Sequence, residues 1–486
     1  MNEFLIKNKS FISYLMAVIA ITLFTYVLYY YNPPSVFWDE NYHIAAAQKY
    51  LGGIMFMEPH PPLGKLFISL GEWLVNANAN VDTNQFLLVD HIKNFPQGYS
   101  FAGVRFFPTM FGASSAILFF LIFLKISKHL RYSFLFTSLY LFANSFIIQS
   151  RSAMLESTQI FFIFLTVLYF LHLFDKEKTS LKEMLIFGVL MGLSVSVKLN
   201  SLIIILLYPF LFFYQQDLTI KKQILLKYFV KNGAVVMVGL LGVFSFVFYI
   251  HFALGGTLGN NHYKSSAEYR QILSEHSNAS VLSFPTMMKD NLKFIAEYSN
   301  GVPRLDVCKV GENGSHPSSW PLGNKSINYR WDKNGDLVRY LYLQSNPVIW
   351  FSVALSMLVA LSLLVAKFVF SLPIKDQRLF YLVSVFSGMY FSYMAVMLSI
   401  GRVMYLYHYF MPLFFGMFVL FLLFNYIFKE KIEAQSNKLT FSVIAFVLLI
   451  ILSFYWYSPF TYYQPLNYED FMQRVIFDFW KLTPIR

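Results

Sequence analysis

Long apolar runs recur along the whole chain, and they limit what it can fold into more than any other feature. The chain has 486 residues, of which 57% are hydrophobic and only 13% are charged. A run of ~20 apolar residues is long enough to cross a bilayer as a helix, and several runs reach that length. The first, residues 11–31, is too long for a signal-peptide core and lacks a small-residue cleavage site. The sequence therefore predicts an all-α polytopic membrane protein rather than a soluble enzyme.

By the length criterion we expect about eleven transmembrane helices. The third to sixth are short and closely spaced. Each span reverses the side of the membrane, so their order decides which loops lie on the same side. The expected spans lie near residues 11–31, 102–124, 132–149, 154–174, 183–197, 200–214, 230–252, 347–370, 379–400, 404–428 and 440–457.

The charges of the loops test that order. If the N-terminus, with Lys7 and Lys9, is cytoplasmic, then alternate loops carry most of the lysines and arginines, as the positive-inside rule predicts. The net charge of +12 therefore fits cytoplasmic loops better than a nucleic-acid partner. The cations of these loops are Lys125, Lys128, Arg131, Lys176, Lys178, Lys182, Lys221, Lys222, Lys227, Lys231, Lys375, Arg378, Lys429, Lys431 and Lys438.

The same order divides the chain into membrane parts and outer parts. A first outer loop, a large outer loop and an outer tail are expected on the non-cytoplasmic side. The large outer loop is polar and long for a loop without structure of its own, so we expect a small folded cap or a partly mobile lid. The outer parts are residues 32–101, 253–346 and 458–486, and the membrane parts are residues 1–31, 102–252 and 347–457.

Polar and charged side chains gather in the first outer loop. Asp39-Glu40 and His43 follow the first span, and Glu58, His60 and Lys65 come soon after. Asp39-Glu40 precedes a short amphipathic helix, and the prolines after His60 predict a rigid turn that leads into a second one. Charged groups beside a membrane are costly, so this cluster is a candidate functional site.

Three isolated cations, Arg151, Lys198 and Arg402, fall at helix ends on the same expected side as Asp39. A lone cation at a helix end often extends to the interface without further function, and for one such residue the two interpretations are about even. Convergence of all three on the side of Asp39 favours the functional interpretation. Glu156 is either a site carboxylate or an acid that stabilises the dipole of the fourth span.

An acidic pair at a membrane surface with cations nearby suits transfer of a group from a lipid-phosphate donor. Arginine or lysine can hold the phosphate and stabilise the charge that grows as it leaves. A carboxylate within hydrogen-bond reach can take the proton of an acceptor hydroxyl. This chemistry requires no cofactor. A divalent-metal site is the alternative, and its ligands would come from Asp39, Glu40, His43, Glu58 and His60.

At these residues the chain resembles the protein O-mannosyltransferases, a family of GT-C-type membrane glycosyltransferases. The family's first outer loop carries an Asp-Glu pair, an aromatic residue and a histidine, then an acidic residue shortly before His-Pro-Pro-Leu-Gly-Lys. Here these are Asp39-Glu40, Tyr42-His43, Glu58 and residues 60–65. The resemblance continues at Arg105, Gly112, Arg151 with Glu156, Gly188, Gly192, Lys198, Ser319-Trp320-Pro321, Asn346 to Trp350, Tyr407 to Phe410, Pro459 and Tyr462.

The chain departs from the family's pattern in two ways. Many eukaryotic members carry three MIR repeats in the large outer loop, and residues 253–346 are too few to hold them. The resemblance therefore implies a short prokaryotic form in a plasma or inner membrane. Glu58 and Glu156 stand where the family commonly has aspartate, which keeps the charge and adds a methylene of reach.

The resemblance implies that mannose moves from a polyprenyl-phosphate carrier to serine or threonine hydroxyls of translocated proteins, in a single displacement that inverts the anomeric centre. Asp39 is then the general base, and Glu40 positions the acceptor or supports the base. Arg151 holds the phosphate, with Lys198 or Arg402. Relatives often pair, so a dimer is one expected assembly. The other substrate-binding residues expected are His43, Glu58, His60, Lys65, Glu156, Tyr407 and His408.

Two other functions stay open from the sequence. A related enzyme that decorates a glycolipid such as lipid A would share the acidic loop and the cations. A transporter of lipid-linked sugar is disfavoured, because transporters tend to show paired repeats and broken helices near mid-membrane. This chain shows no internal repeat, and its polar cluster lies at the outer surface.

Overall fold

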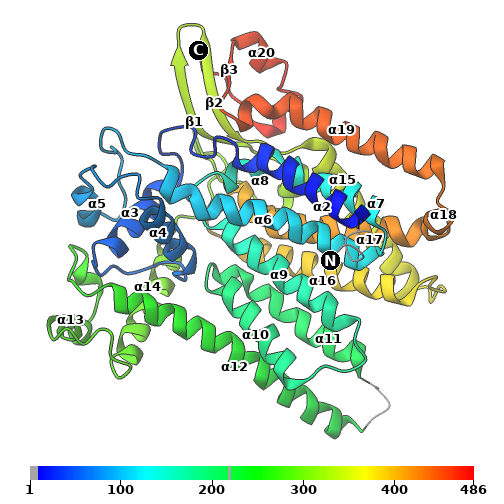
Figure 1. Ribbon diagram of the computed structural model, residues 1–486, viewed down its shortest axis with the longest axis horizontal. Helices are drawn as coiled ribbons and strands as arrows, with labels where there is room; N and C mark the ends of the chain where they lie inside the picture. Colours follow the sequence, from blue (N-terminus) through cyan, green and yellow to red (C-terminus); the bar gives the residue numbers. More distant parts are fainter. Residues whose placement is uncertain (1–8, 217–220, 486) are drawn as a thin grey trace. The chain divides into compact units, whose positions relative to one another are not determined.

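The computed structural model describes residues 9–216 and 221–485, and helices dominate it (Figure 1). Within these residues, eight helical segments are long and apolar enough to cross a membrane, which confirms the polytopic class. Lys7 lies outside the described residues. The eight are α2 with η1 (Lys9–Thr22 and Leu23–Val27), α6 (Ala102–Ser127), α9 (Glu156–Phe174), α12 (Lys222–Leu254), α15 (Pro347–Phe368), α16 (Gln377–Ser399), η5 with α17 (Leu406–Tyr409 and Phe410–Ile427) and α19 (Asn437–Thr461).

The remaining expected spans are built from shorter helices. Each of these helices falls below the length that crosses a bilayer alone, so the number of eleven spans is not confirmed. Residues 132–149 lie in α7 (Leu130–Leu141) and α8 (Asn144–Ser150), residues 183–197 in α10 (Leu181–Val195), and residues 200–214 in η2 (Leu199–Leu206) and α11 (Leu207–Gln215).

The chain forms two compact units. The first-loop unit comprises Tyr29–Ser115 and Ser150–Val302, and the C-terminal unit comprises Met1–Leu28, Ala116–Gln149 and Pro303–Arg486. Of the large outer loop expected at 253–346, residues 253–302 belong to the first-loop unit and residues 303–346 to the C-terminal unit.

The first-loop unit contains the helices of the first outer loop, namely α3 (Glu40–Leu51), α4 (Leu63–Val75) and α5 (Asn84–Leu88). Helix α4 begins after Pro62, because proline's fixed φ suits the start of a helix. Both α3 and α4 turn apolar faces into a core shared with α6 and α9. Buried members of this core are Ile44, Ala45, Ala47, Leu63, Ile68, Phe86, Phe101, Val104, Leu155 and Phe162.

Glycines bring α10 and α12 into backbone contact. A Cβ added at Gly188 would lie 2.0 Å from the carbonyl oxygen of Val236, and one at Gly192 would lie 2.7 Å from that of Leu240. Small residues four positions apart allow membrane helices to approach this closely. The pair fixes the end of α10, and Lys198 lies shortly after that end.

The part of the large outer loop that belongs to the first-loop unit holds η3 (His262–Lys264), α13 (Ala267–Ser274) and α14 (Phe284–Gly301). The amide of Met55 donates to the carbonyl of Thr257 (2.7 Å), and the Thr257 amide donates to the carbonyl of Gly53 (2.9 Å). Asp90 accepts from Lys49 at 2.9 Å and from Lys264 at 2.8 Å. This part is a folded cap hydrogen-bonded to the first outer loop, which is one of the two alternatives expected above.

The C-terminal unit also contains three short strands, which add a small sheet to the predicted helical fold. Strands β1 (Ile327–Asn334), β2 (Leu337–Leu343) and β3 (Pro465–Leu466) form one antiparallel sheet in the order β1-β2-β3. The hairpin turns at Gly335, whose φ of 59° suits glycine. Figure 1 shows β2 beside α19 and α20 (Tyr468–Met472). The unit also holds η4 (Pro317–Leu322), α18 (Lys429–Glu433) and η6 (Asp478–Trp480).

Candidate functional site

Asp39 lies half-buried at the N-terminus of α3. Its carbonyl accepts the amides of Tyr42 (3.1 Å) and His43 (3.3 Å), which starts the helix. Its carboxylate forms no capping hydrogen bond to the described residues of the helix. A carboxylate beside a helix N-terminus is stabilised in its charged form by the dipole. The side chain of Asp39 therefore stands at the start of α3 without capping that helix.

Glu40 is buried in a complete set of hydrogen bonds. Arg105 donates through Nε to Oε1 (2.7 Å) and through Nη2 to Oε2 (2.8 Å), and both side chains are 0% exposed. The amide of Ala153 donates to Oε1 (2.8 Å) and that of Phe37 to Oε2 (3.2 Å). Each carboxylate oxygen thus accepts two bonds. This arrangement favours the second expected role of Glu40, support of Asp39, over contact with an acceptor.

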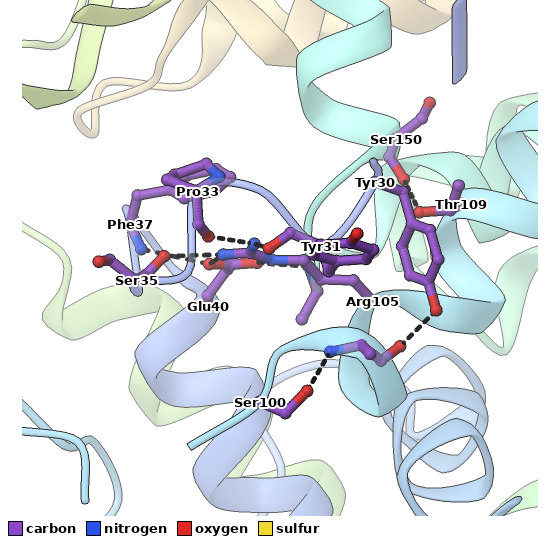
Figure 2. A network of polar contacts seen from close by, with 12 residues as sticks. Tyr30, Tyr31, Pro33, Ser35, Phe37, Glu40, Ser100, Arg105, Thr109 and Ser150 are labelled. Atoms are coloured by element: carbon purple, nitrogen blue, oxygen red, sulfur yellow. Dashed lines mark hydrogen bonds and ion pairs between the residues drawn. The ribbon is translucent and has the colours of Figure 1, made fainter. Parts of the chain in front are cut away.

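Arg105 fixes the loop that leads to Asp39 (Figure 2). Its Nη1 donates to the carbonyls of Tyr31 and Pro33, each at 2.7 Å, and its Nη2 donates to that of Ser35 at 2.8 Å. With the two bonds to Glu40, all five guanidinium N–H donors have acceptors. Sequence reasoning assigned Arg105 no role beyond a resemblance, although an arginine in the first turn of an apolar span is itself a signal of a buried partner.

Arg151 lies on the segment between α8 and α9 and is buried. Its Nη2 donates to the carbonyl of Tyr29 (2.7 Å), just before the loop that Arg105 holds. Figure 2 shows the neighbouring bond from the Thr109 hydroxyl to the carbonyl of Ser150. Since Ala153 also donates to Glu40, the Arg151 segment and the Asp39 loop are tied together within the first-loop unit.

The second half of the predicted motif forms a buried turn. The Nζ of Lys65 lies 2.6 Å from Oε1 of Glu58, with side chains 5% and 0% exposed, and the amide of His60 donates to the same oxygen (3.1 Å). Burial raises the pKa of Glu58 above its ordinary value, although the charge and hydrogen bond of Lys65 oppose that shift. The pair is therefore an ion pair in a strongly desolvated place.

A glycine joins this turn to a second ion pair. A Cβ at Gly64 would lie 2.7 Å from Leu155 and 3.2 Å from Val197, the residues just before Glu156 and Lys198. Glu156 and Lys198 are paired at 2.5 Å, with side chains 9% and 13% exposed. Lys198 is thus a paired and largely buried cation rather than one that extends freely to an interface, and Glu156 begins α9, as the dipole interpretation also expects.

Buried polar atoms that have no hydrogen-bond partner among the described residues include Oδ1 of Asn41, Nδ1 of His43 and Oε2 of Glu58. Burial lowers the pKa of His43 well below its ordinary value, and the nearby charges of Lys65, His60 and Lys198 lower it further. His43 is therefore neutral at pH 7. Native proteins rarely leave such atoms unsatisfied, so these atoms mark a place where an ordered water or a polar ligand can bind.

The other predicted residues lie in the C-terminal unit. Arg402 is half-buried and forms an antiparallel bridge with Arg304. The ring of Tyr407 stacks on that of His408 with centroids 4.7 Å apart, and Trp320 stacks on the same histidine at 6.2 Å. These form an aromatic cluster with a cation close by in sequence. The structure brings together in the first-loop unit Asp39, Glu40, His43, Glu58, His60, Lys65, Arg151, Glu156 and Lys198.

The alternative metal site is not assembled. Over residues 9–216 and 221–485, no three His, Cys, Asp or Glu side chains group closely enough to hold a metal ion. Two of the expected ligands are engaged elsewhere, because Glu40 binds Arg105 and Glu58 binds Lys65.

Two family models match most of the chain. One, described as dolichyl-phosphate-mannose-protein mannosyltransferase, matches residues 16–254. The other, described as the C-terminal four TMM region of protein-O-mannosyltransferase, matches residues 287–480. Every residue of the candidate site in the first-loop unit falls in the first match.

Curated relatives match over shorter stretches. Protein O-mannosyl-transferase 1 of Danio rerio is 29% identical over 188 residues, which are 38% of this chain and 25% of the relative. Dolichyl-phosphate-mannose–protein mannosyltransferase 1 of Candida albicans is 27% identical over 248 residues, 49% of this chain and 28% of the relative. The chain thus spans about a quarter of the length of these relatives.

Solved structures share the fold. A chain of the Saccharomyces cerevisiae protein O-mannosyltransferase Pmt1-Pmt2 complex bound to the sugar donor superposes with a TM-score of 0.78 at 16% identity, over 96% of this chain and 92% of that one. The apo oligosaccharyltransferase of Archaeoglobus fulgidus gives 0.50 at 12% identity, over 98% of this chain and 60% of that one. The fold is therefore of the GT-C type.

Proposed function

Because the chain belongs to the protein O-mannosyltransferase family, we propose that it transfers mannose from a polyprenyl-phosphate carrier to serine or threonine hydroxyls of proteins. The bond between the sugar's anomeric carbon and the phosphate oxygen breaks, and a bond from that carbon to the acceptor oxygen forms. Polyprenyl phosphate leaves with the electron pair. The acceptor's proton passes to a carboxylate, so atoms and charge balance in a single inverting displacement.

Asp39 is the proposed general base. It is half-buried at the start of α3, and its carboxylate is not used as the helix cap. A hydroxyl has a very high pKa, so it attacks effectively only when a base within hydrogen-bond reach takes its proton as the new bond forms. Glu40 supports this base by fixing the first turn of α3 through Arg105 and the two backbone amides.

The cations of the first-loop unit are the proposed phosphate site. Arg151 offers a planar fork that matches phosphate oxygens. Lys65 and Lys198 are compact charges that lie close enough to His43 to lower its pKa. As the phosphate leaves, negative charge grows on its oxygens, and fixed cations in a desolvated site stabilise that charge.

The observation that carries this proposal is the pair of unsatisfied polar atoms on His43, one turn from Asp39, and on Glu58. Nδ1 of His43 and Oε2 of Glu58 are buried without partners in the part of the chain that the structure describes, and the amide of His43 bonds to the carbonyl of Asp39. A sugar presents hydroxyls that both donate and accept, so it can satisfy a neutral imidazole nitrogen and a carboxylate oxygen together. His60, Glu156, Tyr407 and His408 are proposed as further substrate contacts.

The direct test is a transfer assay with the purified full chain in lipid nanodiscs. Polyprenyl-phosphate mannose is supplied with a peptide rich in serine and threonine, and a peptide with alanine at those positions is the control. Mannosylated peptide with the inverted anomer is the expected product. A third arm offers lipid A as acceptor. Transfer only to the glycolipid, or to neither acceptor, would contradict the proposal.

The proposed active face is non-cytoplasmic, so a lipid carrier must bring the sugar across the membrane. In a Cys308→Ser background, single cysteines at Asn84 and Asn300 should react with a membrane-impermeant thiol reagent in intact cells. Cysteines at Glu177 and Glu433 should react only after permeabilisation. All four positions are exposed, so reagent access depends on the side of the membrane. The reverse pattern would place the Asp39 loop in the cytoplasm and exclude the carrier.

A further inference from the structure

Asn291 of the cap helix α14 contacts the main chain of Glu58 at two atoms. The amide of Glu58 donates to Oδ1 of Asn291 (3.3 Å), and Nδ2 of Asn291 donates to the carbonyl of Glu58 (3.1 Å). Asn291 is 0% exposed. One buried side chain therefore satisfies both backbone groups of Glu58, as a neighbouring strand would.

The segment around Glu58 needs such a partner. It has no regular secondary structure, and it is followed by Pro59, Pro61 and Pro62, none of which has an N–H to donate. The turn thus has few backbone hydrogen bonds of its own. Buried backbone groups without partners are costly, so the amide of Asn291 both satisfies this stretch and fixes its position.

Asn291 lies beside a buried group of aromatic side chains around His251. The hydroxyl of Tyr50 lies 2.8 Å from Nδ1 of His251 in α12, and His251 lies close to Asn291. The ring of Phe56 packs edge-on against His251 with centroids 5.3 Å apart. Tyr50 belongs to the last turn of α3, the helix that begins at Asp39 and Glu40. The end of α3 is therefore bonded to His251, which lies close to the residue that bonds to Glu58.

We propose that Asn291 is a positioning residue for the donor site. It fixes the main chain of Glu58, and thereby the direction of the Glu58 carboxylate and of the Lys65 ammonium bound to it. The inference rests on the proposed function in that Glu58 and Lys65 serve the donor. The cap thus contributes to catalysis through one buried amide, without a contact to substrate.

Asn291→Asp and Asn291→Ala test this in the full chain. Asp keeps the shape and can still accept the Glu58 amide, but it cannot donate to the Glu58 carbonyl. A misplacement of about 1 Å can lower a rate about 100-fold, so we expect kcat/KM for donor to fall about 10- to 100-fold. The acceptor KM should stay within about twofold. Asn300→Ala, an exposed position on the same helix, is the control and should match wild type.

Combining variants distinguishes a positioning role of Asn291 from a role in folding. When Glu58→Gln and Lys65→Met are already present, adding Asn291→Asp should lower donor kcat/KM by less than about threefold, because residues that act through each other are not additive. Full additivity would overturn the inference. So would a loss of activity that follows only the folded fraction, with the KM for donor unchanged in both Asn291 variants.

A binding measurement keeps the two proposals apart. Polyprenyl phosphate should raise the melting temperature of the wild type more than that of Asn291→Asp, because a ligand stabilises according to its affinity for the folded state. Equal shifts would overturn the positioning role even if transfer proceeds. If the wild type transfers no mannose, the proposed function fails, and the melting shifts still decide whether Asn291 serves the anion site.

Discussion

Two buried ion pairs of the first-loop unit are alike in chemistry and differ in how completely they are satisfied. Glu40 receives four hydrogen bonds, and Arg105 uses all five of its donors. Among the described residues, Glu58 receives two bonds on Oε1 and none on Oε2, and its partner Lys65 makes one ion pair. We call the fully hydrogen-bonded Glu40–Arg105 pair the closed pair. We call the Glu58–Lys65 pair, which has an unsatisfied carboxylate oxygen, the open pair.

The difference distinguishes an ion pair that supports the fold from one that can bind a ligand. A buried pair with every group satisfied has no capacity left for a ligand, and removing one member leaves an uncompensated charge. A pair with an unsatisfied oxygen retains capacity for a partner from outside the protein, such as a sugar hydroxyl. The Glu40–Arg105 pair therefore holds the loop in shape, whereas we propose that the Glu58–Lys65 pair binds the donor.

The largest expected effect tests the neighbours Asp39 and Glu40 against each other. Asp39→Asn is nearly isosteric but cannot accept a proton at neutral pH, so kcat should fall by about 10²–10⁴-fold with the melting temperature unchanged. Glu40→Gln should instead lower the melting temperature more clearly than kcat, because Glu40 chiefly contributes to stability. Both are measured as transfer rate and thermal unfolding in nanodiscs. Activity of the Asp39→Asn enzyme within a few-fold of wild type would remove Asp39 from the base role.

Arg105→Met tests the closed pair. It leaves Glu40 buried without its cation and three carbonyls without donors, so the free energy of unfolding should fall by about 3–5 kcal/mol. Adding Glu40→Gln should not restore stability, because the carbonyls of Tyr31, Pro33 and Ser35 still lack donors. Denaturant or thermal unfolding measures both variants. Recovery of stability in the double variant would show that the carbonyl contacts contribute little.

Removing both charges of the Glu58–Lys65 pair should have the opposite effect: activity should fall, and stability should change little. Glu58→Gln with Lys65→Met removes both charges at similar shape, so the free energy of unfolding should change by no more than about 1 kcal/mol. Donor kcat/KM should fall about 10- to 100-fold, because the phosphate and sugar lose fixed partners. Steady-state kinetics with varied donor checks this. A stable variant with normal donor kinetics would make the Glu58–Lys65 pair structural.

The smallest effect comes from a third ion pair that is partly exposed. Partial burial raises the pKa of Asp90, but the hydrogen bonds and charges of Lys264 and Lys49 outweigh burial and lower it to about 2. Because the folded pKa is below the ordinary value of 3.8, the stabilisation is present above about pH 4 and is lost as the pH falls towards 2.

Asp90→Asn should therefore lower stability at neutral pH by less than about 1 kcal/mol, since solvent screens a partly exposed pair. The gap in melting temperature between Asp90→Asn and wild type should close between about pH 4 and pH 2. Asp82→Asn, an exposed acid in the same loop, is the control. A gap that persists at the acid end of this range would show that Asp90 acts through something other than its charge.

Residues of the site that carry charge were predictable, and the residues that hold them were not. Asp39, Glu58, Lys65 and Lys198 stand out because charge is rare in this chain. Asn291 is an ordinary amide in a polar segment, and only the fold places it on Glu58.

The hairpin had a local signal that the span-based prediction did not use. Asn334-Gly335 lies between two stretches rich in aromatic and β-branched residues, which is typical of a tight hairpin turn. The division of the large outer loop at Val302 had no such signal, because membership of a unit depends on long-range packing. Periodicity and charge thus predict elements and reactive groups, while pairings between distant segments need the tertiary structure.

The contacts of Arg105 have a consequence for how the chain is made. All the groups that accept its hydrogen bonds, the carbonyls of Tyr31, Pro33 and Ser35 and the carboxylate of Glu40, precede it in the sequence and are therefore synthesised first. A charge at the end of an apolar segment resists transfer into lipid unless a partner neutralises it. When α6 leaves the ribosome, its counter-charge already exists, and the loop can close over the arginine as the helix is inserted. The geometry around Asp39 can then form early in biogenesis, before the C-terminal half of the protein has been translated.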